Sequence, residues 1–133
     1  MRTSALSALM FALLAAANIR AEEIVVIVNP AAKSLNKEQI ADLYLGRTRG
    51  LTPVDQTVGS AIYTEFYKKA TGRDSAQIKA IWSRVLFTGR GQPPKHLSDS
   101  AAVKKAVATN SNTVGYIEKS AVDASVKVAL PLD

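Results

Sequence analysis

The sequence contains no cysteine and a single histidine. The lack of cysteine excludes a disulfide framework, so an ordinary hydrophobic core has to stabilise the domain. Neither a zinc site nor a nucleophile–histidine pair can be assembled from His96 alone. The spacing of the acidic residues does not single out two of them as a general acid and base. We therefore expect no catalytic residues, no metal and no cofactor.

Long hydrophobic runs are also absent, apart from one near the start of the chain. Residues 1–21 contain Arg2, an apolar run from Ala5 to Ala17, and then small residues. This run is too short to span a bilayer and is typical of a secretory signal peptide. We expect cleavage after Ala21 and a periplasmic protein; cleavage after Ala17 and an uncleaved anchor are the alternatives.

Removal of the signal peptide would leave residues 22–133, which are enough for one compact domain but not for two. The 17 basic residues include Arg2 and Arg20, so 15 would remain against 11 acidic residues, giving a net charge of +4. That mild excess tolerates an anionic ligand or surface. Because the basic residues are scattered and not interleaved with aromatic ones, we expect no nucleic-acid partner.

The apolar residues follow strand and helix periods. Residues 23–28, EIVVIV, form a continuous run ended by an Asn-Pro pair, which is typical of a strand buried on both faces. Such a strand needs helices on both sides. Residues 36–46 predict one helix, with Asn36 and Gln39 as a capping box and a glycine as its stop.

The rest of the chain continues the alternation of helices and strands. Further helices are expected in residues 59–72 and 75–89 and after a cap at Ser98 or Asp99, strands at 113–117 and 126–130, an extended piece near 52–55, and a loop at 90–97. The order predicts a three-layer α/β/α single domain with a small mixed sheet.

Four segments together resemble a known family. These segments are VNPAAKSLNKEQIADLYLGRTRG, GSAIYTEFY, IWSRVLFTGRGQPP and VGYIEKS. Taken in this order, they resemble the short, single-lobed members of the phosphate-type periplasmic solute-binding proteins. The resemblance covers nearly all of residues 24–130. It implies one lobe of a type II periplasmic binding protein and a link to ABC-type phosphate transport.

In that family an R-x-D-G-S-G-T motif at a helix start holds the oxyanion. The resemblance places Gly59 and Ser60 at its first Gly-Ser pair, Gln56 at the arginine and Val58 at the aspartate. A glycine and a serine at a helix N-terminus let an anion approach unpaired N–H groups and a hydroxyl donor. Replacement of the arginine, the aspartate and the threonine weakens binding by about 3 kcal/mol, or roughly a hundredfold.

Other residues are candidates for the same oxyanion site. Arg47, Arg49 and Arg90 would replace the lost positive charge if their loops lie beside Gly59, and Asn29 follows the first strand, where α/β proteins bind ligands. Their alternatives are solvated loop charge and turn chemistry. For Gly59 and Ser60 the alternative is an ordinary helix start with Thr57 as its N-cap.

Two functions remain from the sequence. The first is a periplasmic binding module for phosphate or a similar oxyanion, with Gly59, Ser60, Gln56 and Thr57 as the cradle. The second is an adaptor that has lost the ligand and offers its surface to a permease or an envelope sensor. A homodimer would rebuild the missing lobe in either case.

Overall fold

The computed structural model describes residues 23–132, and the expected signal peptide lies outside that range. The chain order is β1 (Ile24–Val28), α2 (Lys37–Tyr44), β2 (Thr52–Asp55), α3 (Ala61–Thr71), α4 (Ser75–Phe87), β3 (Lys95–His96), α5 (Ser100–Thr109), β4 (Thr113–Glu118), the 3-10 turn η2 (Lys119–Ala121) and β5 (Lys127–Leu132). The expected order of elements is confirmed, and β3 adds a two-residue strand inside the predicted loop.

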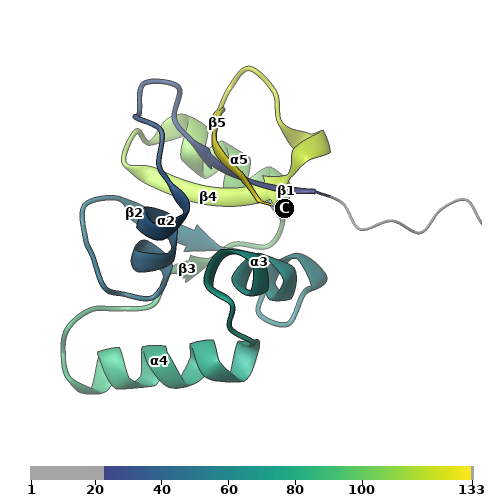
Figure 1. The fold of residues 1–133 in the computed structure, drawn as a ribbon. Coiled ribbons are helices and arrows are strands. Elements are labelled where there is room, and N and C mark those ends of the chain that lie inside the picture. The colour runs from purple at the N-terminus through teal and green to yellow at the C-terminus, as the bar shows by residue number, and fades with distance from the viewer. Residues whose placement is uncertain (1–22, 133) are drawn as a thin grey trace, which may run out of the picture.

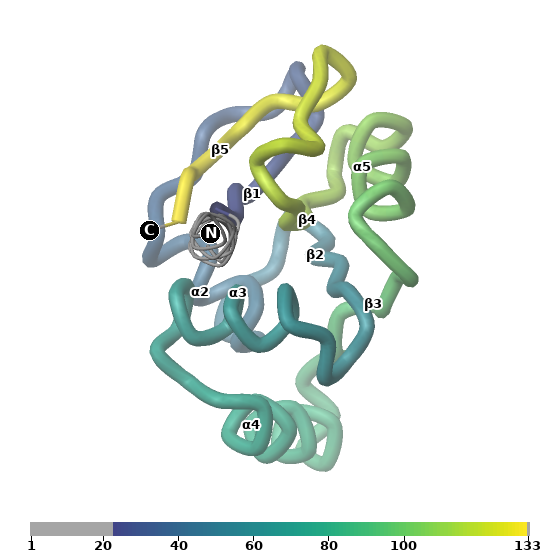
Figure 2. Tube along the Cα trace, turned by 90° about the vertical axis from the view of Figure 1, so that its right-hand side faces the viewer, coloured from purple at the N-terminus to yellow at the C-terminus, as the bar shows by residue number. Residues whose placement is uncertain are grey.

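The five strands form one mixed sheet in the order β3-β2-β4-β1-β5. β1 lies between β4 and β5 and is antiparallel to both, whereas β2 is parallel to β4 and to β3. Figure 1 shows α2 and α3 on one side of these strands, and the turned view in Figure 2 shows α5 on the other side. The architecture is therefore the expected three layers of α, β and α.

All five residues of β1 are buried, because each face of the strand packs on helices. Ile24, Val26 and Val28 belong to the core cluster that contains the buried residues of α2 and α3. Val25 and Ile27 belong to the opposite cluster with the buried valines of α5. The sequence run that predicted burial on both faces thus occupies the middle layer.

The helix boundaries follow local capping chemistry. Asn36 and Gln39 form the expected capping box of α2, and Asp74 forms a second capping box at α4. Asp99, rather than Ser98, caps α5. No helix within residues 23–132 is long and apolar enough to cross a membrane.

The helix α4 lies apart from the sheet, below α3 (Figure 1). Three of its residues, Ile78, Trp82 and Val85, are buried. Leu86 is 50% exposed, and the neighbouring Phe87 is 92% exposed. The separation of α4 from the sheet leaves a hollow on either side of this helix.

Candidate functional site

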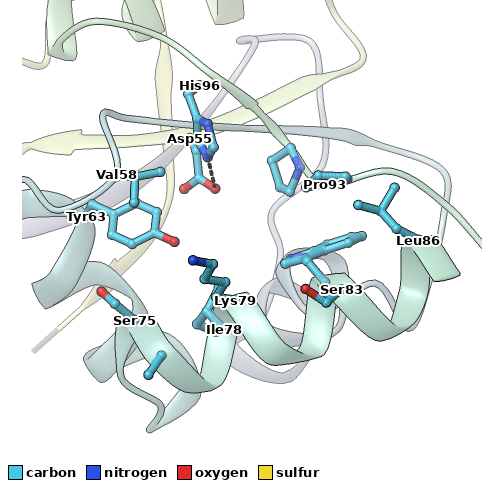
Figure 3. Close-up of a pocket in the computed structure, with 13 residues that line it drawn as sticks. Asp55, Val58, Tyr63, Ser75, Ile78, Lys79, Ser83, Leu86, Pro93 and His96 are labelled. Carbon is cyan, nitrogen blue, oxygen red and sulfur yellow. Dashed lines mark ion pairs between the residues drawn. The ribbon is translucent and has the colours of Figure 1, made fainter.

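The larger hollow is a cleft of about 440 Å³ between α4 and the carboxyl end of β2. Its walls are mainly apolar, with polar groups at one end (Figure 3). The lining residues come from the β2 end and the turn after it (Asp55, Val58), α3 (Tyr63), α4 (Ser75, Ala76, Ile78, Lys79, Trp82, Ser83, Leu86) and the segment around β3 (Pro93, Pro94, His96). A volume of this size is typical of small-molecule sites.

Trp82 fixes the position of α4 beside the cleft. Its indole N–H donates to the carbonyl of Tyr44 across 3.0 Å. The ring can lie this close because residue 46 is glycine: a Cβ at Gly46 would come within 2.9 Å of the indole. The glycine after α2 therefore lets the indole seat against the end of that helix and form one wall of the cleft.

Asp55 lies at the polar end of the cleft and is the most unusual charged group in the fold, because its residue is only 2% exposed. The hydroxyls of Tyr67 and Tyr116 each donate to its carboxylate across 2.7 Å. Burial raises the pKa of Asp55 to about 6, although these two hydrogen bonds act in the opposite direction. The carboxylate is thus charged above neutral pH and is held mainly by the two phenols.

The two tyrosines that hold Asp55 stay protonated. Burial raises the pKa of Tyr67 and of Tyr116 far above the ordinary value, and the adjacent carboxylate raises both further. Tyr116 also accepts a hydrogen bond from the backbone N–H of Gln56 across 3.1 Å. Its ring stacks on Phe66, with the ring centroids 3.8 Å apart.

His96 is brought to Asp55 by the pairing of two strands. The parallel register between β2 and β3 sets residue 96 beside residue 55. The imidazole Nε2 lies 3.8 Å from a carboxylate oxygen of Asp55, and the side chain is 43% exposed. The histidine ring also meets Tyr63 edge to face, with the centroids 6.3 Å apart.

Lys79 and Tyr63 present polar groups to the same end of the cleft. Figure 3 shows the ammonium of Lys79 and the hydroxyl of Tyr63 pointing into the space below the Asp55–His96 pair. Neither group has a hydrogen bond or an ion pair with another described residue. Both are therefore available to a solute in the cleft.

The polar groups of the cleft are partly engaged with the protein itself. Each carboxylate oxygen of Asp55 accepts a hydrogen bond from a phenol, one from Tyr67 and the other from Tyr116. Ser75 and Ser83 line the cleft, but within residues 23–132 neither serine is hydrogen-bonded to His96. In the same range there is no group of three His, Asp or Glu residues that could hold a metal ion.

The predicted cradle lies in the turn that borders the cleft at Val58. Gly59 has a φ of +86°, which glycine adopts readily and which suits the third position of the turn from residue 57 to residue 60. Ser60 is the N-cap of α3: its hydroxyl accepts from the N–H of Tyr63 and donates to the carbonyl of Thr57. Because the helix begins at residue 61, its N-cap is Ser60 and not Thr57, which the sequence analysis had named as the alternative.

The N-terminus of α3 still has free donors. The N–H groups of Ala61 and Ile62 have no acceptor among the described residues, as is usual for the first helical positions. A Cβ at Gly59 would meet nothing within 4 Å, so the approach to this turn is open.

Gln56 and Thr57 are engaged by the protein itself. The amide of Gln56 is buried and donates to the carbonyl of Tyr116 and to the hydroxyl of Ser100, both across 2.9 Å. The hydroxyl of Thr57 donates to the carbonyl of Ser98. Gln56 therefore does not point its amide at the Gly59 turn as a ligand group would.

Asn29 is also engaged in structural contacts. Its amide donates to the carbonyls of Val107 and Ala108, at the end of α5, and its side-chain oxygen accepts from the N–H of Ala31. These bonds join the end of β1 to the end of α5, which is the turn chemistry given as the alternative in the sequence analysis.

Arg47, Arg49 and Arg90 lie near one another, but none of them lines the cleft beside Gly59. The guanidinium of Arg49 donates to the carbonyl of Arg90, and Arg47 forms an ion pair with Asp42 across 3.3 Å. Arg47 and Arg90 line a separate hollow on the other side of α4.

Sequence reasoning missed His96, Lys79 and Tyr63 as members of one site. His96 was set aside because it is the only histidine, and a two-residue strand leaves no periodic signal that would place it beside β2. Tyr63 repeats with the apolar residues of α3 and is mostly buried, so its sequence pattern does not distinguish it from a core residue. Lys79 gave no signal, because an exposed lysine on a helix is ordinary.

The comparisons with known proteins bear on the fold. No family model matches the sequence, and no curated protein matches it well enough to be called a relative. The structure resembles an ABC-type phosphate transport receptor from Vibrio cholerae with a TM-score of 0.62 and 18% identity, over 80% of this chain and 45% of that chain.

Two other solved structures agree with this likeness. A phosphate ABC transporter substrate-binding protein from Clostridium perfringens, solved with bound phosphate, gives a TM-score of 0.65 and 22% identity over 81% of this chain and 44% of that chain. PstS from Borrelia burgdorferi gives a TM-score of 0.52 and 10% identity over 74% of this chain and 41% of that one. The chain spans less than half the length of these proteins, and over that length it has the fold of the phosphate-receptor substrate-binding proteins.

Proposed function

We propose that this chain is a non-catalytic periplasmic binding module that holds phosphate or a similar oxyanion at the N-terminal turn of α3. Gly59 and Ser60 form the turn, and the free N–H groups of Ala61 and Ile62 are the main donors. A helix N-terminus carries a partial positive charge and binds anions without further help from side chains.

The observation that carries the proposal is the Lys79 ammonium in the cleft bordered by the same turn. Val58 of that turn and Lys79 of α4 line one cleft, and the ammonium is unpaired within the described part of the chain. A lysine so placed supplies a positive charge that Gln56 cannot supply. A charge-assisted hydrogen bond of this kind contributes about 1.5–3 kcal/mol.

The structure neighbours support an oxyanion as the ligand, because one is a phosphate transport receptor and another was solved with bound phosphate. The cleft bordered by the α3 turn is open to solvent on one side. We propose that a second copy of the chain, or a permease or envelope sensor, covers it.

We also propose that residues 1–21 direct export of the protein. N-terminal sequencing of the mature protein tests this role.

Thermal unfolding at low ionic strength, with and without millimolar phosphate, tests the binding proposal. We expect phosphate to raise the melting temperature, and the increase to be reduced in Ala61→Pro, which removes one donor at a helix position where proline is well tolerated. Ser60 already has the extended backbone that a residue before proline requires. Lys79→Gln should reduce the increase as well.

Two control variants keep the proposed contacts. Ala61→Gly retains the N–H group, and Lys105→Gln removes the same charge as Lys79→Gln from an exposed position on α5. Both controls should respond to phosphate as the original protein does. A melting temperature that phosphate and sulfate leave unchanged contradicts the proposal, and an increase that survives Ala61→Pro and Lys79→Gln places the anion elsewhere.

A second candidate function, that of an adaptor, is favoured by the apolar groups around the cleft. Val58 is 54% exposed. On α4, Leu86 is 50% exposed and Phe87 is 92% exposed. Such a surface is suited to a protein partner. Pull-down from envelope extract with the original protein and with a Leu86→Ser, Phe87→Ser double variant tests this function: capture lost in the variant supports it, and equal capture by both proteins contradicts it.

A further inference from the structure

A second hollow, of about 290 Å³, lies on the opposite side of α4 from the cleft. Four arginines line it, and they come from four different segments: Arg47 after α2, Arg73 after α3, Arg84 on α4, and Arg90 after α4. We call it the arginine hollow. Its other lining residues are Leu45, Ile81, Val85 and Thr88, so no acidic residue lines it.

Three of the four arginines follow a glycine that ends a helix. Gly46, Gly72 and Gly89 have φ values of 75°, 73° and 70°, and each is followed directly by an arginine. Left-handed glycines end helices because they bear no Cβ. The repeated Gly-Arg pair thus sets an arginine just beyond the ends of α2, α3 and α4.

Backbone hydrogen bonds hold Arg47 and Arg90 in equivalent positions. The N–H of Arg47 donates to the carbonyl of Asp42 across 2.8 Å, and the N–H of Arg90 donates to the carbonyl of Val85 across 3.0 Å. Each bond spans six residues, as in the Schellman motif. Arg49 ties the two loops together through its bond to the carbonyl of Arg90. These hydrogen bonds therefore fix the loops that carry Arg47 and Arg90 at the hollow.

The positive charge of the arginine hollow is only partly offset by the protein. Arg47 is paired with Asp42, and Arg73 donates to the carbonyl of Thr71 across 3.2 Å. Arg84 and Arg90 have no carboxylate partner in the part of the chain that the structure describes. Each helix end contributes a negative charge of about half an electron, so an excess of roughly one to two positive charges remains.

We propose that the arginine hollow is a second anion site, which binds a multiply charged phosphate group. Guanidinium groups match the geometry of phosphate oxygens through paired N–H donors, and several of them at one hollow favour a dianion or pyrophosphate over a monovalent anion. The site is separate from the cleft, because Arg84 and Val85 lie on the face of α4 opposite Lys79 and Ser83. The phosphate is either free or carried by a small organic molecule.

Isothermal titration calorimetry at low ionic strength tests this site, with phosphate, pyrophosphate and glycerol phosphate as ligands and nitrate as the monovalent control. We expect pyrophosphate to bind more tightly than phosphate and nitrate not to bind. An Arg84→Gln, Arg90→Gln double variant should lose about tenfold or more in pyrophosphate affinity. Equal affinities for phosphate and glycerol phosphate indicate an exposed site that accepts an organic carrier, whereas binding of phosphate alone indicates the free anion.

A matched variant separates the effect of these two arginines from a general loss of positive charge. Lys37→Gln with Lys105→Gln removes the same two charges as the arginine double variant at exposed positions outside both hollows, and it should leave pyrophosphate affinity unchanged. We expect the arginines to repel one another when no ligand is bound. The arginine double variant should therefore melt at a higher temperature than the original protein when no anion is added. Absence of pyrophosphate binding, an equal loss in both double variants, or a lower melting temperature of the arginine double variant without anion overturns the proposal.

Discussion

The hydroxyl of Tyr116 donates to the Asp55 carboxylate across 2.7 Å while accepting the N–H of Gln56. Tyr116 lies in the middle of β4, and Asp55 is the last residue of β2. This contact joins the interior of the domain to the polar end of the cleft. The phenol therefore has a structural part, as an acceptor for a buried backbone group, and an electrostatic part, as a donor to a buried charge.

Removal of either phenol hydroxyl should destabilise the fold. A hydrogen bond to a charged group contributes about 1.5–3 kcal/mol, so Tyr67→Phe and Tyr116→Phe should each lower the free energy of unfolding by about that amount. Tyr116→Phe should cost more, because it also leaves the N–H of Gln56 without its acceptor. Tyr63→Phe is the matched control, since that hydroxyl has no partner among residues 23–132. Urea unfolding at pH 8 measures all three, and an equal loss in the control would contradict the assignment.

Stability should fall as the pH rises through the pKa of Asp55. Burial raises that pKa to about 6, so the folded state holds a proton that the unfolded state has released above about pH 4. The stabilisation is complete below about pH 4 and is lost as the pH rises through about 6. A shift of two pKa units corresponds to about 3 kcal/mol.

The test is urea unfolding between pH 4 and pH 8 of the original protein and of Asp55→Asn. The variant lacks the titrating group, so the difference in unfolding free energy between the two proteins should change in favour of the variant as the pH rises. The absolute stability of the variant does not enter this comparison. A difference that stays constant across the range would show that the pKa of Asp55 is not raised.

Asn29 should contribute to stability rather than to anion binding. Its amide bonds to Val107 and Ala108 are lost in Asn29→Ala, which should lower the free energy of unfolding by about 1–2 kcal/mol. The response of the melting temperature to phosphate should not change. Asn112→Ala is the control, because its exposed side chain forms no hydrogen bond with a described residue, and it should change stability by less than about 0.5 kcal/mol. A phosphate response abolished in Asn29→Ala would return this residue to the ligand site.

The sequence predicted the order of elements well because the signals were local. The capping box of Asn36 and Gln39, the left-handed Gly72 at the end of α3 and the apolar run of β1 each depend on residues close in sequence. A local pattern reports the geometry of its own segment. It says less about which segments meet.

The site was harder to predict because it depends on pairing between distant segments. Asp55 meets His96 through a parallel strand pair of two residues, too short for any periodic pattern. The same limit applies to the arginines: Arg47 and Arg90 were candidates for a place beside Gly59, but they line a hollow with Arg73 and Arg84 on the other side of α4. Their shared Gly-Arg context was visible in the sequence, but the packing of three helix ends was not.

The contact between β4 and α5 predicts that residue 115 has to be glycine. A Cβ at Gly115 would lie 2.4 Å from a methyl of Val103 and 3.2 Å from one of Val54. Gly115→Ala should therefore push α5 from the sheet and lower the free energy of unfolding by about 1–3 kcal/mol. Gly91→Ala adds the same methyl group where the nearest atom is 3.5 Å away, and it should be nearly neutral. Chemical unfolding of both variants decides, and equal stability would show that α5 moves aside without cost.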